Sequence, residues 1–191
     1  MNTRVGVVVM TGGHSKRMGQ AKEQLLIGGE TLLERMAKEL AGFSEKYISV
    51  NAKQNYEITG YQTIVDEIPD IGPMGGIYSA LKHCSCEALL VVACDMPYYR
   101  LEQAESIIKQ WNGEDVCLLR TPSGIQPLAS IYRKTCLPVL KQRMEQKQYR
   151  LRDIFHFVHV KETQDLSEKP YFNINTFSEY EHAANMDAET L

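Results

Sequence analysis

The chain of 191 residues lacks the long apolar and long basic segments that characterise membrane and nucleic-acid-binding proteins. Its longest wholly apolar runs, Val7 to Met10 and Ala88 to Cys94, fall far short of the ~20 residues that a membrane-spanning helix requires. No block of lysine and arginine is present to neutralise successive phosphates, and the formal net charge is -3. We therefore expect neither a membrane nor a nucleic-acid partner.

Cysteine and histidine also lack the spacing of disulfide frameworks and zinc sites. The five cysteines are an odd set without a Cys-x-x-Cys pair. His156 and His159 have no second cluster of ligands, so we expect no metal role for them. A strand-like run begins almost at the N-terminus and leaves no room for a signal peptide. These features predict a cytoplasmic protein with reduced thiols.

The composition is that of an ordinary globular protein, with 43% hydrophobic and 24% charged residues. The sequence contains no repeat, no low-complexity segment and no linker rich in proline, glycine or serine. Its length suits one hydrophobic core. We therefore expect a single domain over residues 1–191.

Short β-branched runs alternate with segments whose apolar residues recur at helical spacing, which is the pattern of βαβ units. Apolar residues at Leu32, Leu33, Met36 and Leu40 predict one face of a helix that Gly42 could end. The charged stretch Lys141 to Arg152 is interpreted as a solvated helix end and loop. The other expected helices are Gly76 to His83, Leu101 to Trp111, Thr135 to Glu145 and Ser178 to Ala184. The expected strands are Val5 to Met10, Tyr47 to Val50, Thr63 to Val65, Ala88 to Ala93, Val116 to Leu119, Leu128 to Tyr132 and Val158 to Lys161.

A glycine-rich, basic segment from Met10 to Lys22 follows the first expected strand. Glycines allow a close backbone approach, so the N–H groups of such a loop can bind phosphate oxygens while Arg17 and Lys22 supply positive charge. The spacing is neither that of a Walker A loop nor that of the dinucleotide G-x-G-x-x-G motif. On spacing alone, a structural strand-to-helix turn with exposed basic residues explains the segment almost as well.

Polar side chains follow three further expected strands: Asn51, Asp66 and Asp95. Ligands of open α/β sheets bind at the carboxyl ends of the strands, where these residues fall. Asp95 is a candidate ligand of Mg²⁺, which prefers oxygen donors. A single aspartate in this position more often forms a turn or caps a helix. Three polar residues at successive strand ends, close to one basic glycine-rich loop, favour a nucleotide site.

A set of short motifs extends over nearly the whole chain. The first is the loop pattern Gly12-Gly13-x-Ser15-x-Arg17-Met18-Gly19-x-x-Lys22. The later ones, in order, are Val50-Asn51-Ala52, Asp66, Gly72-Pro73-Met74-Gly75-Gly76, Cys94-Asp95-Met96-Pro97, Gln126-Pro127-Leu128 and Asn173-Ile174-Asn175-Thr176. The combined set resembles the motifs of the MobA family, the molybdenum cofactor guanylyltransferases, whereas the loop alone would indicate only the wider group of Rossmann-like nucleotidyltransferases.

This resemblance implies a Rossmann-like, three-layer α/β nucleotidyltransferase fold with a mostly parallel central sheet. It further implies transfer of GMP from GTP to molybdopterin or molybdenum-molybdopterin, with Mg²⁺ as cofactor and pyrophosphate as by-product. The N-terminal half would bind the nucleotide and the C-terminal half the acceptor. Other proteins of molybdenum cofactor biosynthesis, or recipient enzymes, are the expected protein partners.

The resemblance also assigns a role to individual residues. Arg17, Lys22 and Asp95 would be catalytic, and Asp95 would bind the metal. The nucleotide would contact Met10, Thr11, Gly12, Gly13, Lys22, Asn51, Asp66 and Asp95. The acceptor would contact Gln126, Pro127, Asn173 and Asn175.

Two positions depart from the family's pattern, in which an acidic residue usually precedes the loop lysine and a proline commonly follows Asn-x-Asn-Thr. Ala21 and Phe177 occupy these positions. If the missing carboxylate were needed, the chain could be a nucleotide- or pterin-binding carrier without turnover. A related transferase that uses CTP or another acceptor is the nearest alternative. A glycosyltransferase is disfavoured because the sequence has no Asp-x-Asp motif after the fourth expected strand. An NAD-dependent oxidoreductase is disfavoured because the dinucleotide motif is absent.

Overall fold

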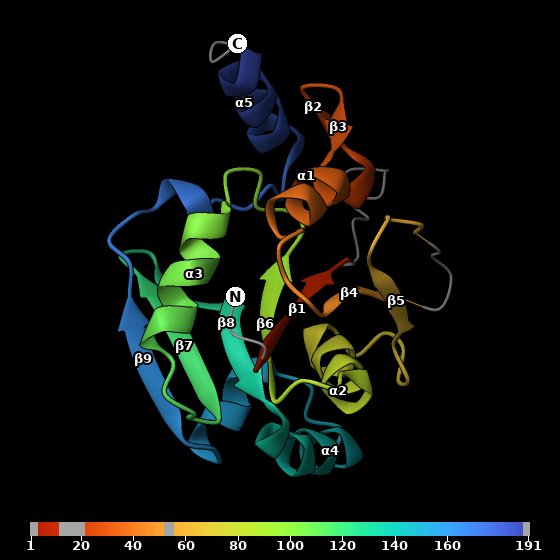
Figure 1. Ribbon diagram of the computed structural model, residues 1–191, viewed down its shortest axis with the longest axis vertical. Helices are drawn as coiled ribbons and strands as arrows, with labels where there is room; N and C mark the ends of the chain where they lie inside the picture. Colours follow the sequence, from red (N-terminus) through yellow and green to blue (C-terminus); the bar gives the residue numbers. More distant parts are fainter. Residues whose placement is uncertain (1–3, 12–21, 52–55, 189–191) are drawn as a thin grey trace.

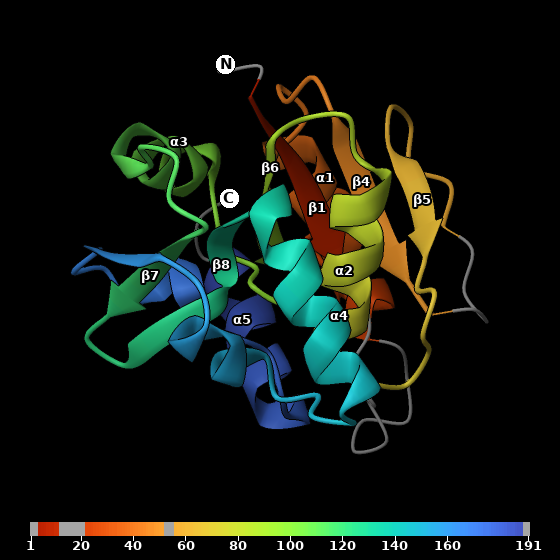
Figure 2. The same cartoon turned by 90° about the horizontal axis from the view of Figure 1, so that it is seen from below.

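A seven-stranded sheet forms the middle layer of the protein, between two layers of helices (Figures 1 and 2). The computed structural model describes residues 4–11, 22–51 and 56–188. The strands lie in the order β5 (Gln62–Val65), β4 (Lys46–Val50), β1 (Val5–Met10), β6 (Ala88–Ala93), β8 (Gly124–Arg133), β7 (Val116–Thr121) and β9 (Val160–Gln164).

Most neighbouring strands of this sheet are parallel. β1 pairs in parallel with β4 and β6, β4 with β5, and β7 with β9. β8 runs antiparallel to both of its neighbours, β6 and β7. The predicted α/β class with a mostly parallel sheet is confirmed, as is the central position of the apolar run Ala88–Ala93.

Each face of the sheet is covered by helices and has its own apolar core. α1 (Leu32–Glu39) and α3 (Leu101–Gln110) cover one face, and α2 (Pro73–His83) and α4 (Leu137–Glu145) cover the other. Because successive side chains of a strand point to opposite faces, Leu90 and Val92 of β6 enter the first core. Leu89 and Val91 enter the second core. All four side chains are fully buried, which explains why a strand of this sheet is apolar throughout.

A small extra layer lies beyond the carboxyl ends of β1 and β6 (Figure 1). It consists of the two-stranded ribbon β2 (Leu26–Ile27) and β3 (Glu30–Thr31), together with helix α5 (Phe177–Ala188). These elements share a buried apolar cluster formed by Leu25, Ile27, Leu32, Ile174 and Ala183. The 3₁₀ helices are η1 (Lys22–Gln24), η2 (Lys134–Cys136), η3 (Leu151–His156) and η4 (Lys169–Tyr171).

Some element boundaries differ from the predictions. α2 begins at Pro73 rather than Gly76, because proline suits the first position of a helix, where no N–H is needed. β8 begins at Gly124 rather than Leu128, since it continues directly from the turn after β7. The expected helix from Thr135 is divided into η2 and α4. β9 begins at Val160 rather than Val158.

None of the helices within the described ranges is both long and apolar enough to cross a membrane.

Candidate functional site

The carboxyl ends of the parallel strands place most of the predicted nucleotide residues at one edge of the sheet. Met10 ends β1 and pairs with Ser49 of β4 and with Ala93 of β6, so Thr11, Asn51 and Asp95 follow at the same edge. This is the edge at which ligands bind in open α/β sheets. Three predicted residues, Gly12, Gly13 and Arg17, lie outside the described residues.

Lys22, Asp95 and Asn175 meet at this edge although they are far apart in the sequence. The Lys22 ammonium group lies 3.5 Å from Oδ2 of Asp95 and donates a hydrogen bond of 2.8 Å to Oδ1 of Asn175. The backbone N–H of Ile174 donates a 3.0 Å hydrogen bond to the carbonyl oxygen of Asp95. The structure therefore brings a residue predicted on the acceptor side into direct contact with one predicted on the nucleotide side.

The carboxylate of Asp95 is largely withdrawn from solvent, with 19% of its side chain exposed. Burial raises its pKa above the ordinary value of 3.8, and the neighbouring Lys22 ammonium group opposes this rise. Oδ1 is buried and has no hydrogen-bond partner among the described residues. A buried carboxylate oxygen without a partner needs an explanation, and a hard cation is one.

The donor set at Asp95 suits a cation that takes few ligands from the protein. Within the described ranges, no group of three or more His, Cys, Asp or Glu side chains could hold a metal ion. Mg²⁺ typically binds one or two carboxylates and completes its shell with water and substrate phosphates. The single carboxylate of Asp95, at the end of a strand, fits this mode of binding and does not fit a closed structural site.

Asp66 and Asn51 are each held by another side chain. Asp66 Oδ1 accepts a hydrogen bond of 2.8 Å from the Ser49 hydroxyl, and Asn51 Nδ2 donates one of 3.0 Å to Asp70. Burial raises the pKa of Asp66, while the hydrogen bond from Ser49 lowers it. α2 can approach Ser49 and Asp66 closely because Gly76 has no side chain. A Cβ atom at this position would collide with Ser49 Oγ and lie 3.2 Å from Asp66 Oδ1. The glycines before and within α2 thus have the turn and packing role that the sequence allowed.

The remaining predicted acceptor residues do not converge on Lys22 through the hydrogen bonds of their side chains. Gln126 donates to the Thr121 hydroxyl at 3.1 Å, and Asn173 donates to the carbonyl of Tyr171 at 3.0 Å. The carbonyl of Pro127 accepts a hydrogen bond of 2.9 Å from Tyr132, and its ring lines a cavity.

This cavity has a volume of about 680 Å³ and lies between the start of α2, strand β8 and helix η3. Its β8 residues, Pro127 and Leu128, directly precede Ala129, which pairs with Val92 near the carboxyl end of β6. Two lining residues of the cavity therefore lie near the end of β6 that leads to Asp95. Its lining residues are Pro73, Pro127, Leu128, Arg150, Leu151, Arg152, Asp153 and His156.

Sequence reasoning missed the contribution of η3 to this cavity. The stretch Lys141 to Arg152 is a helix end and an exposed loop as far as Arg150, but Leu151 within it is only 6% exposed. Ile154, just beyond it, is fully buried. The three-residue spacing of Leu151 and Ile154 was the available signal, because it matches one turn of a 3₁₀ helix. Buried Leu151 fixes the adjacent Arg150 and Arg152 at the cavity.

Fold and site together place polar and charged side chains at the carboxyl edge of a mostly parallel α/β sheet, where proteins of this architecture bind their ligands. A model of the "MobA-like NTP transferase domain" matches residues 7–164. The chain belongs to this family, and it is therefore a nucleotidyltransferase.

Individual relatives agree with this assignment. The chain is 33% identical over 180 residues to a protein named "Probable molybdenum cofactor guanylyltransferase" from Pelotomaculum thermopropionicum, covering 90% of this chain and 88% of the relative. A crystal structure of molybdopterin-guanine dinucleotide biosynthesis protein A from Archaeoglobus fulgidus matches with a TM-score of 0.83 and 22% identity, covering 96% and 99% of the two chains. A manganese complex of a Mycobacterium tuberculosis protein matches with a TM-score of 0.66 and 16% identity, covering 95% and 97%. At these identities the two solved structures show a shared fold.

Proposed function

We propose that the chain transfers GMP from GTP to molybdopterin or molybdenum-molybdopterin, forming the guanine dinucleotide and pyrophosphate. The observation that carries this proposal is the pairing of Lys22 with Asp95, which has a buried, unpartnered carboxylate oxygen, at the carboxyl edge of the sheet. The family and its relatives named as molybdenum cofactor guanylyltransferases support the choice of substrates.

The acceptor would be the nucleophile and needs no general base. A phosphate monoester has a second pKa of about 6, so it is largely ionised at neutral pH. The difficulty is the approach of one anion to another, which requires positive charge, in-line placement and donors directed at the departing pyrophosphate. The Lys22 ammonium group at the strand edge is such a donor, and Arg17 and the backbone of the glycine-rich loop would add others.

The nucleotide would lie along the edge formed by β1, β4 and β6. Met10, Thr11, Gly12 and Gly13 would line its path after β1, as the resemblance of the loop implies. Asn51 and Asp66, at the ends of β4 and β5, would hold the nucleoside. The hydrogen bonds that fix Asn51 to Asp70 and Asp66 to Ser49 support this role, because they hold both polar groups in one orientation before a ligand arrives.

The acceptor would occupy the cavity beside β8, so that the C-terminal half of the chain completes the site. The apolar side chains of Pro73, Pro127 and Leu128 suit a ring system, and Arg150 with Arg152 suits a terminal phosphate. Gln126, Asn173 and Asn175 would contribute from the same half of the chain. This arrangement corresponds to a nucleotide-binding N-terminal half and an acceptor-binding C-terminal half within one domain.

The divalent cation would be Mg²⁺, held by Asp95. When bound, it would neutralise phosphate charge and polarise the phosphoryl group. Comparison of turnover with Mg²⁺ and with Mn²⁺ tests this choice, because the similar mycobacterial structure is a manganese complex.

Pyrophosphate release from the purified chain tests the function. The protein is incubated with Mg²⁺, molybdopterin and each nucleoside triphosphate in turn, and a reaction without molybdopterin serves as the control. We expect release with GTP that depends on the acceptor. Release with CTP in place of GTP would identify a cytidylyltransferase, and nucleotide binding without any release would identify a carrier.

A further inference from the structure

The turn that carries Asn175 is held by one carboxylate of α5. The Oε2 atom of Glu179 accepts hydrogen bonds of 2.7 Å from the backbone N–H groups of both Asn175 and Thr176. In return, the backbone N–H of Glu179 donates one of 3.2 Å to the Thr176 hydroxyl. This reciprocal pattern is a capping box, which satisfies N–H groups that the start of a helix would otherwise leave unpaired.

This capping box is joined directly to the candidate site. Asn175 accepts the hydrogen bond of Lys22 through its side chain, while its backbone is bound to Glu179. The preceding residue, Ile174, is fully buried and donates its N–H to the carbonyl of Asp95. The charge of Lys22 also lowers the pKa of Glu179, and the charge of Glu179 acts to raise the pKa of Asp95. The same short turn therefore contacts both members of the ion pair.

We infer that Glu179 is a positioning residue, which holds the Asn175 turn so that Lys22 is directed to the phosphate site beside Asp95. This inference deepens the proposed guanylyl transfer and rests on it. A lysine has four rotatable side-chain bonds, so its ammonium group occupies one place only when neighbours hold it there. Asn175 provides that neighbour, and the two charge-assisted hydrogen bonds to Glu179 fix the position of Asn175.

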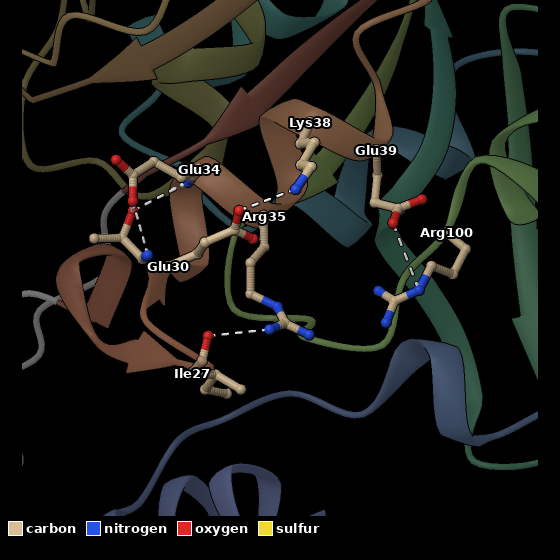
Figure 3. A network of polar contacts seen from close by, with 8 residues as sticks. Ile27, Glu30, Glu34, Arg35, Lys38, Glu39 and Arg100 are labelled. Carbon is tan, nitrogen blue, oxygen red and sulfur yellow. Dashed lines mark hydrogen bonds and ion pairs between the residues drawn. The ribbon is translucent and has the colours of Figure 1, made fainter. Parts of the chain in front are cut away.

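The chain contains a matched control for the structural part of this role. Glu34 of α1 forms the same capping box with Thr31, with hydrogen bonds of 2.8 Å and 3.1 Å (Figure 3). Both glutamates are the third residue of their helix, and a backbone hydrogen bond is the largest cause that lowers the pKa of each. The lowered pKa of Glu34 comes from its hydrogen bonds with Thr31, whereas the charge of Lys22 also lowers the pKa of Glu179. Removal of either carboxylate should therefore destabilise its helix to a similar extent, but only the removal of Glu179 should lower turnover.

The experiment compares Glu179→Ala, Glu179→Gln and Glu34→Ala in the full-length chain. For each variant, Tm is measured together with kcat and KM for GTP in pyrophosphate release. We expect similar falls in Tm for the two alanine variants, and a loss in kcat of about 10- to 100-fold for Glu179→Ala alone, as for a misplaced catalytic group. Glu179→Gln retains an acceptor oxygen and should recover most of this loss. Equal kcat values for Glu179→Ala and Glu34→Ala would overturn the inference.

A second measurement does not depend on turnover. The rate at which an amine-acylating reagent modifies Lys22 is followed by peptide mass spectrometry in protein without nucleotide. Lys22 should react severalfold faster in Glu179→Ala than in the wild type, and at the wild-type rate in Glu34→Ala. If the wild-type chain released no pyrophosphate, the proposed function would fail, while this measurement would still decide whether Glu179 positions Lys22. An unchanged rate in Glu179→Ala would overturn the inference.

Discussion

The hydroxyl of Tyr56 donates a hydrogen bond of 2.6 Å to the carboxylate of Glu23, whose residue is 3% exposed. Glu23 directly follows Lys22, and Tyr56 lies in the connection between β4 and β5. Burial raises the pKa of Tyr56, and Glu23 raises it further, so the phenol remains a donor across the physiological range. The bond therefore ties the lysine segment to the part of the chain that follows Asn51.

Tyr56→Phe should destabilise the protein by about 1.5–3 kcal/mol, because it deprives a buried carboxylate of a hydrogen bond. Tyr61→Phe is the matched control, since Tyr61 donates to the uncharged carbonyl of Ala37 at 2.8 Å. That loss should cost about 0.5–1.5 kcal/mol. Urea unfolding of both variants gives the comparison, and equal losses would show that Glu23 does not depend on Tyr56.

Lys22→Ala and Asp95→Asn should each lower kcat by about 10²–10³-fold, or about 2.7–4 kcal/mol, if each removes a group that stabilises the developing charge. Their free energies of unfolding should change far less than this. Steady-state kinetics and urea unfolding on the same preparations separate the two effects. Near-normal turnover in either variant would remove that residue from the mechanism.

Cys94→Ser should retain turnover, although Cys94 is adjacent to Asp95. Burial raises the pKa of the Cys94 thiol, and the charge of Asp95 raises it further, so no thiolate nucleophile is available. The variant exchanges a buried thiol for a hydroxyl and should lose some stability. Its kcat under the conditions used for Lys22→Ala is the measurement, and a loss as large as that of Lys22→Ala would require a role for the thiol.

Asp66 and Asp115 should give opposite dependences of stability on pH. Burial raises the pKa of Asp66, so its contribution is fully present below the ordinary value of 3.8 and is lost as pH rises through the folded pKa. Burial also acts to raise the pKa of Asp115, but hydrogen bonds from Thr135 and the His159 backbone outweigh it and the pKa is lowered. That contribution is present above 3.8 and is lost as pH falls through the folded pKa.

The measurement is urea unfolding of the wild type, Asp66→Asn and Asp115→Asn at several pH values. As pH falls from neutral into the acid range, the wild type should gain stability relative to Asp66→Asn. The wild type should lose stability relative to Asp115→Asn as pH falls from 3.8 through the lowered pKa of Asp115. The same sign for both variants would contradict the two environments described for these carboxylates.

Gly76→Ala should destabilise the protein although alanine is the better helix former by about 1 kcal/mol. The added methyl group would collide with Ser49 Oγ and Met10 Cε, so α2 must shift or the bond between Ser49 and Asp66 must break. Such overpacking typically costs about 1–3 kcal/mol. Thermal unfolding reports the balance, and an increase in Tm would show that α2 moves without cost.

Arg150→Ala should weaken the acceptor site more than the nucleotide site. The loss of a charge-assisted contact costs about 1.5–3 kcal/mol, so KM for molybdopterin should rise about 10-fold or more while KM for GTP stays within about twofold. Lys141→Ala is a suitable control, because its side chain is 64% exposed and lies outside the cavity. A rise in KM for GTP alone would place the nucleotide in this cavity instead.

The fold was predictable where the local pattern was strong. The apolar runs of β1 and β6 gave strands with the observed bounds, because each of their residues is buried on one face or the other. β2 and β3 were missed, since strands of two residues are too short to show an alternation of apolar and polar residues. The antiparallel direction of β8 was not predicted, because the insertion of β8 between β6 and β7 in the sheet is a property of the tertiary structure.

The site was predictable to a smaller extent. Asp95 and Asp66 each follow a strand, so a parallel sheet predicts that both lie at the same edge. The hydrogen bond between Lys22 and Asn175 spans 153 positions, and no local pattern contains such a distance. From the sequence, Glu179 was only a residue of the expected closing helix. A capping box can be recognised from neighbouring residues of the chain, but the sequence does not show which distant residues the capped turn contacts.

The order of elements along the chain has a consequence for synthesis. The last strand of the sheet ends at Gln164, whereas the partner of Lys22 comes later, at Asn175. During synthesis, all strands of the sheet are therefore made before the residue that anchors the lysine. A chain stopped just after Gln164 should still pair its strands but leave its lysine unanchored, so the reaction would be the last capacity that the nascent protein acquires.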